Sequence, residues 1–137
     1  IRERIKNQGL EEYIFMLGHR NDIPEIMAAL DIHCVASFGM EGTTQVIPQA
    51  IAMKTPVVST RMDSIIPLLG NGEWGILVEP ENPQDMANGI MKFLNNSELG
   101  QRMAEKAFSY GKNELSLNRM MDNILTIYHD VLNNSHS

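Results

Sequence analysis

The sequence predicts an α/β fold in which a parallel sheet is covered by helices. Three short runs of apolar residues, at positions 32–37, 56–60 and 75–78, alternate with segments that have the spacing of helices. The runs are continuous rather than interleaved with polar residues, and such strands are typical of a parallel sheet that is buried on both faces. After position 80 helical patterns follow one another, so we expect carboxy-terminal helices beyond the sheet.

Residues that start or stop secondary structure place the other elements. Gly18 ends a fourth apolar run, Pro24 suits the first turn of a helix, and Gly111 is expected to end a late helix. Helix caps are expected at Asp22, Asn82 and Ser97. The expected strands are residues 13–17, 32–37, 56–60 and 75–78. The expected helices are residues 1–10, 22–30, 44–53, 64–69, 82–94, 97–110 and 116–132.

Length and composition describe one domain of ordinary size. The chain has 137 residues, enough for one core but too few for two full α/β halves. We expect a single partial domain over residues 1–137, with an α/β part at 1–80, a helical part at 81–133 and a polar tail at 134–137. Because Ile1 opens an amphipathic helical pattern without a cap, we expect the chain to begin partway through a longer protein.

The charge and the reactive side chains exclude some functions. With 11 basic and 17 acidic residues the net charge is −6. Nucleic-acid binding draws most of its affinity from Lys and Arg, so no nucleic-acid partner is expected. No apolar run approaches the roughly 18 residues that span a bilayer. The histidines and acids have no paired ligand spacing, so no metal is expected. His33 and Cys34 lie in an apolar run, where a packed imidazole and a small buried thiol are expected.

The segment at positions 41–50 (EGTTQVIPQA) lies where a strand is followed by a helix. Ligands of open parallel sheets collect outside the carboxyl ends of the strands, and the free amides of residues 43–45 at the helix start suit a diphosphate. Glu41 would lie within reach of a group beyond the phosphates, and Gln49, one turn inside, could hydrogen-bond ribose hydroxyls. Taken on spacing alone, a turn followed by an acid that the helix dipole favours explains the same residues.

The order of these segments resembles the carboxy-terminal, donor-binding half of the retaining GT-B glycosyltransferases of group 1, which carry a glutamate, seven residues and a second glutamate. The matching segments are FMLG at 15–18, IPEI at 23–26, Ser37 ahead of Glu41 and Gly42, QAIAM at 49–53, TPVV at 55–58 and GEWGILVEP at 72–80. The resemblance implies a Rossmann-like sheet that lacks its first strands.

The resemblance also implies roles for single residues. Glu41 matches the glutamate that contacts the donor sugar and is the implied catalytic residue. The implied donor-binding residues are Gly18 and Arg20 near the nucleobase, Gly42, Thr43, Thr44 and Gln45 at the diphosphate, and Gln49 at the ribose. Three positions depart from the family pattern. Gln49 replaces a glutamate, the spacer at 38–40 is one residue longer, and Lys54 replaces a glycine whose left-handed backbone costs other residues roughly 1 kcal/mol.

The implied parent enzyme transfers a sugar from a nucleoside diphosphate sugar to a saccharide or lipid-linked acceptor in polysaccharide or lipopolysaccharide biosynthesis, with no metal or other cofactor. It would be cytoplasmic and peripheral at the inner membrane face. The acceptor would bind through a missing amino-terminal domain. The family also carries a basic pair on an earlier segment, which neutralises the leaving diphosphate and is missing here, so this fragment alone should be inactive. An open sheet edge would allow self-association, and an exposed apolar face on helix 116–132 would indicate a missing partner domain. The alternatives are a non-catalytic nucleotide- or protein-binding module and a GT-B-like nucleotide-sugar epimerase.

Overall fold

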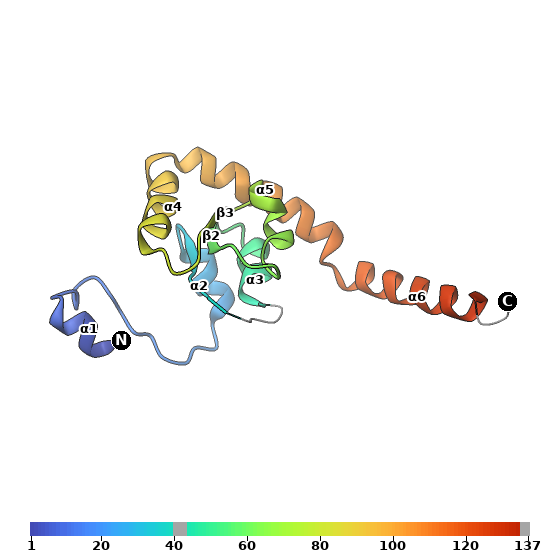
Figure 1. Cartoon of the computed structure of the whole chain (residues 1–137), viewed down its shortest axis with the longest axis horizontal. Helices are drawn as coiled ribbons and strands as arrows, with labels where there is room; N and C mark the ends of the chain where they lie inside the picture. The colour runs from blue at the N-terminus through green and yellow to red at the C-terminus, as the bar shows by residue number, and fades with distance from the viewer. Residues whose placement is uncertain (40–43, 135–137) are drawn as a thin grey trace.

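A three-stranded parallel sheet forms the centre of the molecule. The computed structural model describes residues 1–39 and 44–134 (Figure 1). The strands are β1 (His33–Val35), β2 (Val57–Thr60) and β3 (Ile76–Val78), in the order β1-β2-β3. Register pairs His33 with Val57 and Val58 with Ile76. The predicted parallel sheet and its last three strands are therefore confirmed.

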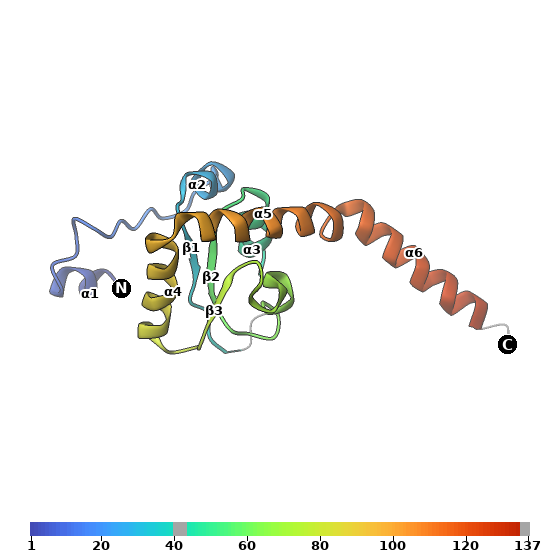
Figure 2. The same ribbon diagram turned by 90° about the horizontal axis from the view of Figure 1, so that it is seen from above.

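Helices precede, separate and follow the strands. They are α1 (Arg2–Asn7), α2 (Ile23–Ala29), α3 (Val46–Ala52), the 3-10 helix η1 (Pro67–Gly72), α4 (Pro83–Asn95), α5 (Ser97–Glu114) and α6 (Leu117–Asn134). Figure 2 shows α4 on one face of the sheet and α3 with η1 on the other. No helix in the described part of the chain is long and apolar enough to cross a membrane.

Each face of the sheet has its own apolar cluster, because successive side chains of a strand point to opposite faces. On the α3 face Val57 packs with Ile47 and Leu69, while on the α4 face Val58 packs with Phe93. All five side chains are buried. The expectation of a sheet covered on both faces is confirmed, and the two clusters fix α3 and α4 relative to the strands.

The expected strand at residues 13–17 is wrong. The segment has no regular secondary structure and joins α1 to α2 outside the sheet (Figure 1). Tyr13 is 76% exposed and Phe15 is 72% exposed. An apolar run forms a stable strand only when a neighbouring strand completes its hydrogen bonds, and the described residues supply none next to it. Its sequence is suited to a strand, but its surroundings are not.

The starts of the two long helices confirm one predicted cap and correct another. Asn82 accepts a hydrogen bond from the amide of Asp85 at 3.0 Å and caps α4, as expected. The cap of α5 is Asn96, which accepts from the amide of Leu99 at 3.0 Å, rather than Ser97. Asparagine and serine are both good caps, so the sequence places this boundary only to within one residue.

Gly111 does not end α5, contrary to the sequence prediction. The helix continues to Glu114. A Cβ at Gly111 would lie 2.8 Å from Cγ2 of Ile51 on α3, which is closer than packed carbons approach. The glycine therefore permits close contact between α5 and α3 instead of stopping the helix.

Residues 63–72 form a turn and the short η1 in place of the expected helix at 64–69. Gly70 and Asn71 have positive φ angles of 57° and 55°, which a regular helix does not allow. A Cβ at Gly70 would lie 2.6 Å from the Trp74 ring, so the glycine allows Trp74 to pack here. The Trp74 ring in turn stacks on Tyr110 of α5, with 4.2 Å between the ring centroids.

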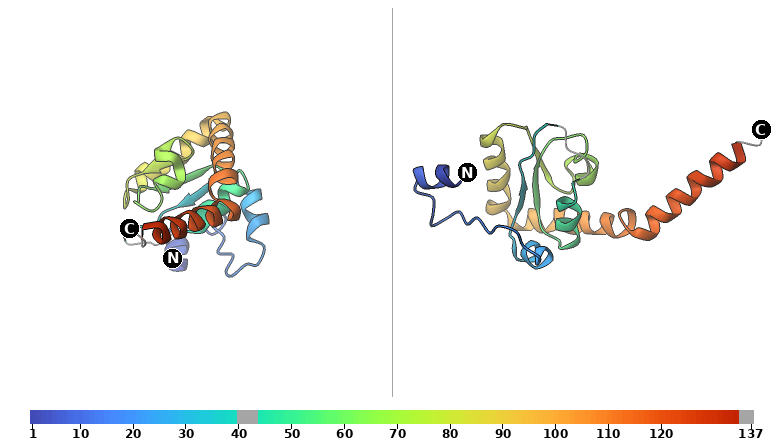
Figure 3. Two further views of the ribbon diagram at one scale, coloured as in Figure 1. Left: turned by 90° about the vertical axis from the view of Figure 1, so that its right-hand side faces the viewer. Right: turned by 90° about the horizontal axis from the view of Figure 1, so that it is seen from below.

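The carboxy-terminal helix α6 extends away from the sheet (Figures 1 and 3). Its exposed apolar side chains are Leu117, Met120, Met121, Ile124, Leu125, Ile127, Tyr128, Val131 and Leu132. We call these nine residues the α6 face. The sequence left open whether this face would be buried, and in this structure it is exposed.

Candidate functional site

The candidate site lies at the carboxyl ends of the three strands. Because the strands are parallel, these ends meet at one edge of the sheet, where Ser37 follows β1, Thr60 ends β2 and Glu79 follows β3. Glu79 donates its amide to Oδ2 of Asp85 at 2.8 Å, which ties the end of β3 to the first turn of α4. Such an edge is where open α/β sheets bind ligands.

Two predicted donor-binding residues share one face of α3. Gln45 stands at the N-cap position and Gln49 lies one turn later, with its amide 3.2 Å from the Gln45 carbonyl. Both side chains are exposed, and among the described residues neither makes a hydrogen bond. Thr44, just before them, is 8% exposed and anchors the start of the helix. The structure thus brings Thr44, Gln45 and Gln49 together, and the two glutamine side chains have no hydrogen-bond partner in the part of the chain that the structure describes.

Glu41, Gly42 and Thr43 lie outside the described residues. Their roles at the donor sugar and the diphosphate stay predictions. On the carboxyl side of this gap the described chain resumes at Thr44.

Gly18 and Arg20 lie on a separate segment, before α2. Gly18 has a positive φ of 70°, which suits a glycine. Arg20 donates from Nε to Oδ1 of Asp22 at 2.7 Å, and its Nη2 contacts Oδ2. No hydrogen bond or ion pair of the described residues links Gly18 or Arg20 to α3. Their predicted place near the nucleobase therefore stays a prediction.

The Arg20 pair also corrects the cap of α2. The hydrogen bond to Arg20 holds the pKa of Asp22 below its usual value and raises the pKa of Arg20. Both carboxylate oxygens of Asp22 contact Arg20, and the side chain makes no capping hydrogen bond. It stands at the N-cap position as predicted, but it does not fulfil that role through its side chain.

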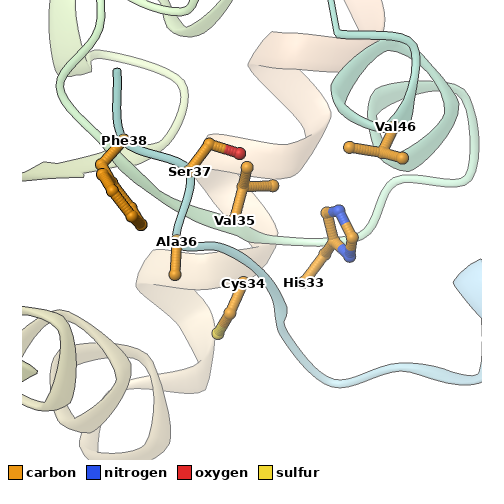
Figure 4. Close-up of a pocket in the computed structure, with 7 residues that line it drawn as sticks. All are labelled: His33, Cys34, Val35, Ala36, Ser37, Phe38 and Val46. Atoms are coloured by element: carbon orange, nitrogen blue, oxygen red, sulfur yellow. The ribbon is translucent and has the colours of Figure 1, made fainter. Parts of the chain in front are cut away.

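A cavity of about 580 Å³ lies along β1. Its lining residues are His33, Cys34, Val35, Ala36, Ser37, Phe38 and Val46 (Figure 4). His33 points toward Val46, whereas Cys34 points the other way. Nε2 of His33 is buried without a hydrogen-bond partner among the described residues, and burial lowers the pKa of this imidazole. The His33 side chain is half-buried, so it is only partly the packed imidazole that the sequence predicts.

Cys34 is exposed, which contradicts the predicted buried thiol. The reason is that β1 is an edge strand of the described sheet. An apolar run predicts a buried strand, but the sequence does not tell which strand has no neighbour.

Sequence reasoning missed two contacts at the carboxyl edge. Thr60 donates from Oγ1 to the carbonyl of Ser37 at 2.6 Å. Arg61, which follows β2, has its Nε 3.5 Å from Oε1 of Glu79. Both contacts join residues at or just beyond the ends of different strands, and no local sequence pattern predicts them. Among the described residues no group of three His, Cys, Asp or Glu side chains could hold a metal ion.

Known proteins match most of the chain. The family described as Glycosyl transferases group 1 matches residues 1–96. The N-acetylgalactosamine-N,N'-diacetylbacillosaminyl-diphospho-undecaprenol 4-alpha-N-acetylgalactosaminyltransferase of Campylobacter jejuni is 32% identical over 109 residues, which cover 79% of this chain and 30% of that protein. The chain spans about a third of the length of the curated relatives it matches.

Solved structures show the same fold. Anabaena HepE, in complex with UDP and glucose, has a TM-score of 0.87 and 26% identity over 94% of this chain and 35% of that chain. The C-terminal domain of the group 1 glycosyl transferase LpcC from Francisella tularensis has a TM-score of 0.72 and 26% identity over 85% of this chain and 60% of that one. The sheet and its helices correspond to part of a GT-B glycosyltransferase, as the sequence predicted, and the chain belongs to the glycosyl transferases group 1 family.

Proposed function

We propose that this chain is the donor-binding part of a glycosyltransferase. The parent enzyme would transfer a sugar from a nucleoside diphosphate sugar to a saccharide or lipid-linked acceptor in polysaccharide or lipopolysaccharide biosynthesis. The observation that carries the proposal is the pair of exposed amide side chains, Gln45 and Gln49, at the carboxyl edge of a parallel sheet. The structure of Anabaena HepE in complex with UDP and glucose supports the proposal.

Each residue of the proposed site has a chemical task. The backbone amides of Thr44 and Gln45, at the start of α3, would donate to the diphosphate. Gln49 would accept a hydrogen bond from a ribose hydroxyl, more weakly than a carboxylate would. Glu41 would orient the donor sugar. No metal ion is part of this proposal.

We expect binding without turnover from this chain alone. Stabilising the charge of the leaving diphosphate is normally a large part of catalysis. Arg61 at the carboxyl edge already shares its charge with Glu79. The acceptor would bind to a further domain, and the α6 face is an apolar surface of the kind that such a domain covers.

A non-catalytic module and a nucleotide-sugar epimerase are not favoured. The matched family and the Campylobacter jejuni relative are glycosyltransferases by name. Nothing in the described residues points instead to an epimerase.

Calorimetric titration with UDP, GDP and ADP tests the proposal and identifies the base. We expect one nucleotide to bind, and Gln49→Ala to weaken that binding about two- to tenfold, the value of one neutral hydrogen bond. Gln101→Ala is the matched control, because Gln101 is also an exposed helical glutamine but lies on α5. Equal weakening by both variants, or no binding by the folded chain, would contradict the proposal.

A further inference from the structure

The hydroxyl of Thr60 holds the chain where it leaves β1. Thr60 is the last residue of β2 and is 4% exposed. The ladder between β1 and β2 ends with the pair Val35 and Ser59. Beyond that pair, Oγ1 of Thr60 donates to the carbonyl of Ser37 at 2.6 Å. A side chain thus continues the connection between the two strands for two residues after β1 has ended.

The residues held in this way lead to the proposed donor site. Phe38 directly follows Ser37 and is 71% exposed. It lines the cavity along β1 and a second cavity of about 540 Å³, which Thr60 also lines. At the far end of the same connection, Thr44 and Ile47 are buried at the start of α3. The cavity along β1 is also lined by Val46, the residue of α3 that directly follows Gln45. Ser37 and Phe38 therefore border the same cavity as the start of α3.

We propose that Thr60 is a positioning residue of the donor site, which acts through the Ser37 carbonyl and not by touching the donor. This inference rests on the proposed function. The proton of the Thr60 hydroxyl is committed to Ser37, so the side chain has no donor left for a ligand. Through this hydrogen bond Thr60 orders the backbone of Ser37 and Phe38 before the nucleotide binds. The bond therefore raises the affinity for the nucleotide.

Thr55 provides a matched comparison at the opposite end of β2. Its Oγ1 donates to the carbonyl of Met27, also at 2.6 Å, and the residue is also 4% exposed. Valine at either position removes the hydrogen bond of a hydroxyl on a buried residue, so both variants should lower the Tm. The Met27 carbonyl keeps the amide of Leu30 as a second donor, at 3.3 Å. Only the bond of Thr60 lies at the carboxyl edge, so only Thr60→Val should also affect the nucleotide.

The test compares Thr60→Val, Thr60→Ser and Thr55→Val with the wild-type chain. We would measure by calorimetry the Kd for the one nucleotide, among UDP, GDP and ADP, that the wild-type chain binds. The Tm and the NMR backbone order parameters of Ser37 and Phe38 would be measured in parallel. We expect both valine variants to lower the Tm. Thr60→Val alone should weaken nucleotide binding, by about two- to tenfold, and lower the order parameter of Phe38. Thr60→Ser keeps the hydroxyl and should restore both.

Several results would overturn the inference. If Thr60→Val leaves both the nucleotide affinity and the order parameter of Phe38 unchanged, Thr60 has no positioning role. Equal weakening by Thr55→Val would show that lost stability, rather than local order, is the cause. If the folded wild-type chain binds none of UDP, GDP and ADP, the proposed donor site fails, and the order parameters alone then decide whether Thr60 orders Phe38.

Discussion

Nζ of Lys54 lies 4.7 Å from the centroid of the Phe108 ring on α5, and it also donates to Oε1 of Glu105 at 2.8 Å. These contacts explain how a lysine is tolerated directly after α3, where the family resemblance leads one to expect glycine. Lys54 has the positive φ of 56° that this expectation required.

Substitutions at Lys54 should separate the backbone strain from the side-chain contacts. Lys54→Ala loses both contacts and keeps the strained φ, whereas Lys54→Gly loses the contacts but relieves the strain. We expect Lys54→Gly to be about 1 kcal/mol more stable than Lys54→Ala in chemical unfolding. Equal stability of the two variants would show that the left-handed backbone carries no cost here.

Gly89 should not tolerate a methyl group. A Cβ at Gly89 would lie 2.9 Å from Cγ1 of Val58 and 3.1 Å from Cγ1 of Val78, both in the core between α4 and the sheet. We expect Gly89→Ala to be destabilising, because overpacking of about 1–3 kcal/mol exceeds the helix propensity gained. Ala87→Gly, on the exposed side of α4, measures the propensity alone. A stabilised Gly89→Ala would show that the sheet and α4 can move apart.

His33 should make the fold less stable in mild acid. Burial lowers its pKa from the ordinary value of 6.5, so the unfolded chain binds the proton more readily than the folded chain. The contribution to stability is therefore complete above pH 6.5 and declines as the pH falls toward the lowered pKa. Urea unfolding between pH 5 and 8 should show a shallower pH dependence for His33→Phe. The exposed His129→Gln serves as control, and an equal change in both variants would refute the assignment.

The open edge of β1 should allow the chain to associate with itself. Among the described residues β1 pairs only with β2, and Cys34 on it is exposed. Unpaired strand edges are templates for pairing with another chain, and a lysine on the edge opposes this. We expect sedimentation to show association that increases with concentration and decreases in Cys34→Lys. Ser97→Lys, away from the edge, controls for the added charge. A monomer at all concentrations would contradict the prediction.

The sheet could be predicted because a strand buried in a parallel sheet is marked by its own short apolar run, which can be recognised without knowledge of distant residues. Each strand of the sheet lies in a short run rich in apolar residues, and the parallel pairing could be inferred from the alternation of these runs with helices. Residues 13–17 have the same local pattern and form no strand, since pairing depends on a neighbour that the run itself does not specify. Gly111 fails for a related reason. A glycine can stop a helix or admit a close neighbour, and only the distance to Ile51 tells which.

The candidate site could be predicted where its residues are close in sequence. Gln45 and Gln49 are four residues apart, so a helix places them on one face. The contact between Thr60 and Ser37 joins residues 23 positions apart, and nothing in either residue's neighbourhood indicates it. The cap of α5 shows the intermediate case, where Asn96 and Ser97 are adjacent and chemically equivalent candidates.

The stacking of Trp74 on Tyr110 provides a natural optical probe. Trp74 is the only tryptophan of the chain, and its ring reports the contact between α5 and the segment that leads into β3. A change in its emission would therefore record separation of α5 from the sheet, while fraying of α1 or α6 would leave the signal unaltered. Comparing emission with circular dichroism during unfolding would separate melting of the central body from melting of the projecting helices.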